Sequence, residues 1–317
     1  MRHLGFGKGL LTFLLVTGVA LGNLNGGVLA KAGTVEGVNS KTAKATGTNN
    51  TNDSKDDTDT TDDSEKDTKT KVKKGIVIKI GKKEETTEVL TGKIKKKKGN
   101  LYFKDSNGKK VKNKFFTYKK NVYHTDKKGI LTTGWMKKKG NCYFFNRNSG
   151  KLVIGKKAES IPINKKGIAK NNKYNISRVK VFIKAQKVVK SVSKKTDSKA
   201  TKLYKAYKWM EKMPYKRYRT MEQAKRTNPK DWDVVFANDI FNNHAGCCAS
   251  ESAAFGYLAK ACGYKKVTIC SDTGHAWMDI NGRLYDPLFS ESRGFKNNYN
   301  AAYTDYRAHY AYGKKLY

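Results

Sequence analysis

A repeat with a period of 21 residues constrains how the middle of this chain folds. Glycines recur at that spacing, and so does an aromatic position in each unit: Gly108, Gly129 and Gly150, with Tyr102, Tyr123 and Phe144. The pattern predicts two short aromatic-rich strands per unit, joined by an Asp/Asn-x-x-Gly turn, and a weaker fourth unit is present at 163–168. Because a single hairpin is marginally stable in water, consecutive hairpins must share a core. We therefore expect residues 71–170 to form a stack of β-hairpins.

The repeat region also carries most of the charge. The formal net charge is +39 over 317 residues. Residues 71–170 hold 30 basic and 6 acidic residues, whereas residues 230–317 hold 10 basic and 9 acidic residues. The positive electrostatic potential of such a region favours an anionic partner such as a wall polymer, a lipid headgroup layer or nucleic acid. The alternative is a lysine-rich composition that serves solubility. We expect an anionic cell-wall polymer as the partner, and no nucleic acid.

The first 70 residues have the composition of a secretion signal followed by a linker. A basic start precedes the apolar run 10–21, and small residues at Ala30 and Ala32 fit a cleavage site, so residues 1–30 are interpreted as a signal peptide. The apolar run is too short to span a bilayer comfortably. Residues 31–70 are polar almost throughout, which predicts a disordered linker. The expected location is secreted and associated with the cell wall.

Helix and strand patterns alternate in the last part of the chain. Apolar residues fall at helical spacing from Val179 to Val192, a second helix begins after Asp197 or Ser198 and stops at Pro214, and a third spans 232–240. Residues 171–197 are interpreted as a helical connector and residues 198–317 as an α+β domain.

Two adjacent cysteines open the strongest helical segment of that domain. Cys247 and Cys248 follow Gly246, and the helical run ends at Gly263. The N-terminus of a helix lowers the pKa of a thiol there, and its free N–H groups are able to form an oxyanion hole. The other three cysteines are interpreted as packing residues. No Cys or His spacing indicates a zinc site, and we expect no cofactor.

A predicted hairpin supplies partners for this thiol. His275 begins one strand, Asn281-Gly282 is a strong two-residue turn, and Asp286 ends the return strand. In this arrangement Asp286 orients the imidazole of His275, and His275 takes the proton of Cys248.

Two segments resemble the transglutaminase-like superfamily: GCCASESAAFGYLAKACGY and GHAWMDINGRLYDP. The resemblance covers about residues 198–317 and implies a papain-like core, in which a helix-start Cys packs on antiparallel strands that carry His and Asp. It implies Cys248 as nucleophile, His275 as base and Asp286 as orienter, with Cys247 as the alternative nucleophile. The implied reaction is acyl transfer or hydrolysis at protein or peptide amide groups through a thioester.

The segment GWMKKKGNCYFF resembles the choline-binding or cell-wall-binding repeat of secreted bacterial proteins. The resemblance implies that Trp135, Tyr143 and Phe145 cage a quaternary ammonium group through cation–π contacts. The alternative is that these aromatics fill the hairpin core. The leading prediction is a secreted bacterial thiol enzyme at the cell surface, and the alternative is a non-catalytic wall-binding protein that uses the thiol fold as a scaffold.

Overall fold

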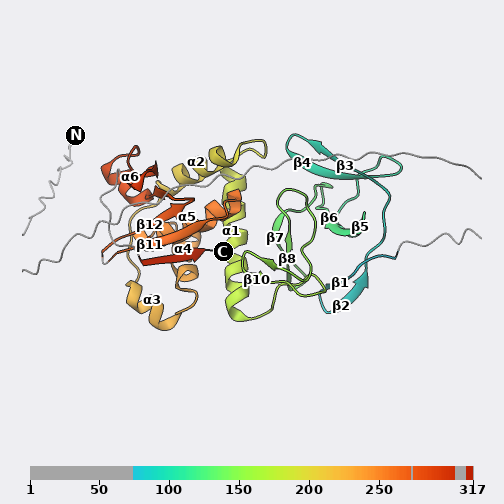
Figure 1. The fold of residues 1–317 in the computed structure, drawn as a ribbon, viewed down its shortest axis with the longest axis horizontal. Coiled ribbons are helices and arrows are strands. Elements are labelled where there is room, and N and C mark those ends of the chain that lie inside the picture. Colours follow the sequence, from blue (N-terminus) through green and yellow to red (C-terminus); the bar gives the residue numbers. More distant parts are fainter. Residues whose placement is uncertain (1–73, 273, 304–311, 317) are drawn as a thin grey trace, which may run out of the picture. The chain divides into compact units, whose positions relative to one another are not determined.

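The computed structural model describes residues 74–272, 274–303 and 312–316, which all belong to one compact unit (Figure 1). The predicted signal peptide and linker, residues 1–70, lie outside the described residues. Within the described part, no helix is long and apolar enough to cross a membrane. The fold is mixed α/β, with small antiparallel hairpin sheets followed by helices packed on a larger sheet.

Two-stranded antiparallel hairpins make up the region from residue 77 to residue 162. They pair β1 (Val77–Ile80) with β2 (Lys83–Thr86), β3 (Gly92–Lys97) with β4 (Asn100–Asp105), β5 (Phe115–Tyr118) with β6 (Asn121–His124), β7 (Gly134–Lys138) with β8 (Asn141–Phe145), and β9 (Lys157–Ala158) with β10 (Ile161–Pro162). A series of hairpins is present as predicted, but the fourth unit at 163–168 is a turn that follows the hairpin of β9 and β10.

The turn inside each hairpin differs from the prediction. The paired strands are joined by two residues with positive φ, at Lys98-Gly99, Lys119-Lys120 and Lys139-Gly140. This backbone matches the right-handed twist of the two strands. The Asp105–Gly108 turn instead follows β4, where the Gly108 N–H donates to the Asp105 carbonyl at 3.0 Å. The Asp-x-x-Gly pattern therefore connects one hairpin to the next.

Neighbouring hairpins share their aromatic side chains, as the repeat predicts. One buried cluster is built on Phe103, Phe116 and Tyr123, which come from successive hairpins. A second joins Ile78, Phe115, Tyr143 and Phe145.

The C-terminal part combines helices with one five-stranded sheet. The helices are α1 (Lys173–Val192), α2 (Lys199–Met210), α3 (Met221–Thr227), α4 (Trp232–Asn243), α5 (Cys248–Cys262) and α6 (Pro287–Arg293). The antiparallel sheet has the order β14-β13-β12-β11-β15, formed by β11 (Val267–Ser271), β12 (Ala276–Ile280), β13 (Arg283–Tyr285), β14 (Tyr299–Ala301) and β15 (Tyr312–Leu316). Helix α5 lies against β11 and β12 (Figure 1).

Most of the predicted helices and strands of this part are present. Ser198, and not Asp197, is the N-cap of α2, since its side chain accepts from the Thr201 N–H at 3.0 Å. The sequence patterns did not indicate α3, α6, β14 or β15, which are short.

Helix α1 belongs to the core and is more than a connector. Val179, Phe182 and Ala185 are fully buried in the same cluster as residues of α2, α4 and α5. Arg178 of α1 is also fully buried and pairs with Asp233 of α4 at 2.8 Å. The helical part of this domain therefore begins at α1.

Candidate active site

Helix α5 is preceded by Gly246, a position where no side chain fits without displacing its neighbours. A Cβ atom on Gly246 would lie 2.5 Å from the Ser250 Cβ and 2.8 Å from a methyl group of Ile240. The Gly246 N–H donates to the Pro214 carbonyl at 3.1 Å, and the Lys216 N–H donates to the Gly246 carbonyl at 2.8 Å. Helix α5 then runs from Cys248 to Cys262 and ends at Gly263, whose φ of 95° places it in the left-handed region.

The two adjacent thiols face different groups. Cys247 is the buried N-cap residue, and its sulfur lies 3.7 Å from Ser250 Oγ, which in turn donates to Asp239 at 2.9 Å. Cys248 is partly exposed, and the backbone N–H of Ala276, the residue after His275, lies near its sulfur. Cys248 is thus the thiol that faces the strand of the predicted base.

Interaction between the two adjacent thiols shifts their pKa values in opposite directions. The Cys248 thiol stabilises a negative charge on its neighbour and lowers the pKa of Cys247 to about 5, despite burial. The same contact raises the pKa of Cys248, and burial adds to that rise. Of the two thiols, Cys247 is therefore the one whose charged form the surroundings favour.

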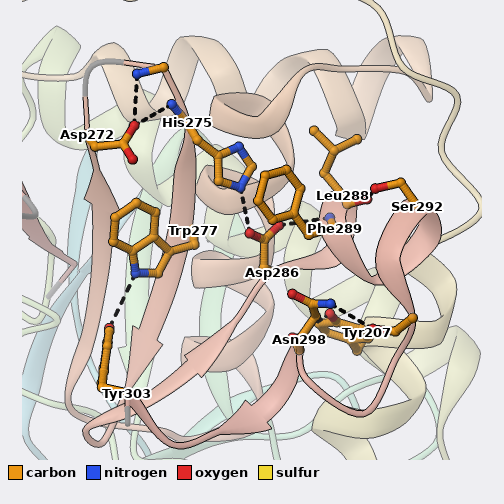
Figure 2. Close-up of polar contacts among 12 residues, drawn as sticks. Tyr207, Asp272, His275, Trp277, Asp286, Leu288, Phe289, Ser292, Asn298 and Tyr303 are labelled. Atoms are coloured by element: carbon orange, nitrogen blue, oxygen red, sulfur yellow. Dashed lines mark hydrogen bonds and ion pairs between the residues drawn. The ribbon is translucent and has the colours of Figure 1, made fainter. Parts of the chain in front are cut away.

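His275 and Asp286 form the contact that the hairpin predicts (Figure 2). Nε2 of His275 lies 2.5 Å from Oδ2 of Asp286, whose side chain is almost fully buried. The other carboxylate oxygen accepts from the Phe289 N–H at 3.1 Å and caps α6. Because Nε2 faces Asp286, Nδ1 is the ring nitrogen left to accept a proton.

Two more contacts fix the imidazole in place (Figure 2). Oδ1 of Asp272 accepts from the His275 N–H at 2.6 Å, which anchors the backbone where β12 begins. The Phe289 ring lies parallel to the imidazole, with centroids 3.9 Å apart and an interplanar angle of 6°. His275 therefore has a single well-defined orientation, with one face covered.

The structure thus brings two of the three predicted catalytic residues into contact. His275 and Asp286 are joined directly, whereas in the described part of the chain no hydrogen bond joins Cys248 to His275. The catalytic roles of all three remain predictions.

Glu251 is a buried acid that the sequence reasoning did not single out. It lies one turn into α5 and is fully buried, and within the described part of the chain neither carboxylate oxygen has a hydrogen-bond partner. Burial, with smaller contributions from the carboxylates of Glu291 and Asp286, raises the pKa of Glu251 to about 9. Its signal in the sequence is a charged residue inside a run of small residues.

The three predicted ligand-binding aromatics are all buried. Trp135 is 3% exposed, and Tyr143 and Phe145 are fully buried. Trp135 stacks on Phe182 of α1 with centroids 6.3 Å apart, and its Nε1 donates to Glu159 at 2.6 Å. Tyr143 and Phe145 belong to a different cluster. The structure therefore divides these residues between two buried clusters instead of one open cage, and choline binding stays a prediction.

The chain's own cations lie over several aromatic rings of the hairpins. Lys110 Nζ is 4.4 Å from the Tyr102 centroid, Lys119 Nζ is 5.5 Å from that of Tyr118, and the Arg147 guanidinium carbon is 5.4 Å from that of Phe144. These positions are the ones that a ligand cation would take. Across the described residues, no group of three or more His, Cys, Asp or Glu is placed to hold a metal ion.

Comparison with solved structures finds similarity over a minority of the chain. Choline-binding protein F from Streptococcus pneumoniae aligns over 26% of this chain and 26% of its own, at 22% identity and a TM-score of 0.24. A multimodular pneumococcal cell wall endolysin from phage Cp-1, complexed with choline, aligns over 26% of this chain and 25% of its own. The sequence identity is 23% and the TM-score is 0.24. The choline binding domain of another Streptococcus pneumoniae protein aligns over 26% of this chain and 95% of its own, at 22% identity and 0.23.

The aligned part spans only about a quarter of the first two of these proteins. No protein-family profile matches the chain, and no curated protein matches it. These similarities do not place the chain in a family.

Proposed function

We propose that this protein is a thiol enzyme of the transglutaminase-like type, which transfers or hydrolyses acyl groups at protein or peptide amides. The observation that carries the proposal is the 2.5 Å contact between His275 and Asp286, formed beside a helix that begins with Cys248. A histidine oriented by a carboxylate and placed near a thiol at a helix N-terminus is the arrangement that activates a nucleophile.

The chemistry follows from these groups. His275 Nδ1 takes the proton from Cys248, and the sulfur attacks the carbonyl carbon of the amide. The C–N bond breaks, the amine leaves with the proton from His275, and a thioester remains on Cys248. An amine or water then attacks the thioester and gives its proton to His275, which regenerates the thiol. Asp286 stabilises the imidazolium in both halves, and backbone N–H groups at the start of α5 face the developing oxyanion.

The test is incubation of the full chain with a glutamine-containing protein and a labelled primary amine, with proteolysis scored in parallel. Cys248→Ala abolishes product formation. Cys247→Ala is the matched control: it removes the sulfur that raises the pKa of Cys248, so it retains turnover and shifts alkylation of Cys248 by iodoacetamide to lower pH. If Cys247→Ala abolishes turnover and Cys248→Ala does not, the nucleophile is Cys247.

We also infer that the hairpin region holds the enzyme at an anionic cell-wall polymer. This part of the proposal is supported by the 30 basic residues in 71–170, against 6 acidic ones. Several of those acids are already neutralised within the fold, as in the pairs Glu88–Lys114, Glu84–Lys166 and Glu159–Arg147. Lysines and one arginine over the aromatic rings favour an anion over choline as the ligand.

A non-catalytic wall-binding protein is the second candidate. The observation that favours it is that no hydrogen bond joins Cys248 to His275 in the described part of the chain, and interaction with Cys247 raises the pKa of Cys248. Alkylation by iodoacetamide at pH 6, followed by mass spectrometry, separates the two candidates. Label on Cys247 is expected for either candidate, because its pKa is lowered to about 5, so the absence of both Cys248 labelling and turnover supports the scaffold function.

A further inference from the structure

An exposed segment between α2 and α3 runs directly beside the start of α5. Residues 214–218 are all exposed. Tyr215 forms a parallel bridge with Gly246, and two backbone hydrogen bonds of 2.8 and 3.1 Å join Lys216 and Pro214 to that glycine. The segment is therefore held against Gly246, which lies two residues before Cys248 in the chain.

The composition of this segment is that of a recognition surface. Tyr215 is 54% exposed and Tyr218 is 36% exposed, which places them among the few large hydrophobic side chains that the described residues leave exposed. Lys216 and Arg217 lie between them, and Lys216 Nζ is 5.0 Å from the Tyr218 ring. Tyrosine and arginine are the residues that contribute most at binding surfaces, because they offer large contact area together with polar groups.

The segment is anchored to the helices that position the thiols. Arg219, the next residue, pairs with Asp239 of α4 at 2.6 Å, and Ser250 of α5 donates to the same carboxylate oxygen at 2.9 Å. The Arg219 guanidinium also lies 5.7 Å from the Phe236 ring. A surface fixed in this way loses little conformational entropy when it binds a ligand. More of the free energy of its contacts therefore contributes to affinity.

We propose that residues 214–218 bind the acyl-donor peptide and select acidic residues next to the reacting amide. The inference rests on the proposed function and names its substrate class. Lys216 and Arg217 supply two positive charges, and the stretch 213–219 contains no acidic residue to neutralise them. The two tyrosine rings supply flat apolar contact along the peptide. An acidic peptide is therefore the occupant that this surface complements.

The experiment measures binding separately from turnover. The full chain carrying Cys248→Ala is titrated, by fluorescence anisotropy, into two labelled peptides of equal length in which glutamine is flanked by glutamates or by lysines. We expect the acidic peptide to bind at least about tenfold more tightly, and Lys216→Glu with Arg217→Glu to remove that preference. Tyr218→Ala weakens binding of the acidic peptide without changing the charge.

A matched control separates this surface from the general positive charge. Lys187 and Lys190 are exposed residues of α1, so Lys187→Glu with Lys190→Glu makes the same change in net charge. The control pair leaves the preference intact if residues 214–218 carry it. An equal loss in both double variants, or equal binding of the two peptides, overturns the inference.

Turnover by the wild-type chain shows which proposal has failed. Reaction of both peptides with equal kcat/KM overturns the specificity and leaves the enzyme function standing. A binding preference without product from either peptide leaves the surface standing and counts against the enzyme function.

Discussion

Asp286 serves the candidate site and the fold at the same time. One carboxylate oxygen contacts His275 and the other caps α6, and the side chain is almost fully buried. Two substitutions separate these roles, because asparagine is a good N-cap residue whereas alanine is not.

We expect Asp286→Asn to lower turnover by roughly 10²-fold or more, with a small effect on stability, because the charge that stabilises the imidazolium is lost. Asp286→Ala lowers turnover similarly and also lowers the free energy of unfolding by about 1 kcal/mol, since the cap is lost. Steady-state kinetics and urea denaturation measure the two effects. Full activity of Asp286→Asn would show that the residue is only a cap.

Glu251 makes the free energy of unfolding fall as pH rises. A carboxylate that is paired with a cation in the folded state has the opposite effect. Its pKa is about 9 in the folded protein and near the ordinary 4.5 when unfolded, so between these values unfolding releases a proton. The free energy of unfolding therefore falls as pH rises, by up to about 1.4 kcal/mol per pH unit from this group. Glu251→Gln removes that slope. Urea denaturation of both proteins at pH 5.5 and pH 8 is the measurement, and equal slopes would contradict the assignment.

Among the secondary-structure elements, the hairpin of β7 and β8 is fixed to helix α1. Trp135 packs on Phe182, and Gln186 accepts from the Trp135 N–H at 2.8 Å while donating to the Trp135 carbonyl at 2.9 Å. This contact gives a physical reason why only one of the three main repeat units carries a tryptophan: this hairpin is the one that meets a helix.

Two glycines of this hairpin give a matched test. Gly134 and Gly140 have φ of 75° and 83°, but a Cβ atom on Gly134 would lie 2.4 Å from Gln186 Oε1, whereas one on Gly140 meets nothing within 4 Å. We expect Gly140→Ala to cost about 1 kcal/mol through backbone strain. Gly134→Ala costs about 1–2 kcal/mol more, because it displaces the hydrogen-bonded Gln186. Equal losses in urea denaturation would show that the Gln186 contact contributes nothing.

The molecule as a whole combines a strongly basic hairpin region with a C-terminal region close to neutral. We expect the full chain to sediment with purified cell walls at low salt and to be released as salt is raised, because exposed charges are screened. Free choline does not compete if the ligand is an anion. The double variant Lys95→Glu with Lys97→Glu, on exposed positions of β3, weakens binding more than Lys187→Glu with Lys190→Glu. Competition by choline, or no sedimentation at low salt, would overturn the anionic ligand.

Features that depend on near neighbours in the chain could be predicted from the order of the amino acids. The 21-residue spacing indicated the hairpins, the small-residue run up to Gly263 indicated α5, and Asn281-Gly282 indicated the turn that brings His275 to Asp286. Each rests on local backbone preferences, which the order of residues sets directly. The turns at Lys98-Gly99 and Lys119-Lys120 were missed, because lysine only weakly signals a positive φ.

The surroundings of those features depend on how the folded chain packs. This packing buried Trp135 against Phe182, kept Glu251 out of water, and placed residues 214–218 beside Gly246. Burial and long-range pairing involve residues far apart in the chain or the exclusion of solvent by several elements at once. The spacing of residues in one sequence indicates neither burial nor long-range pairing directly. The surroundings of these side chains could therefore be described only from the folded structure.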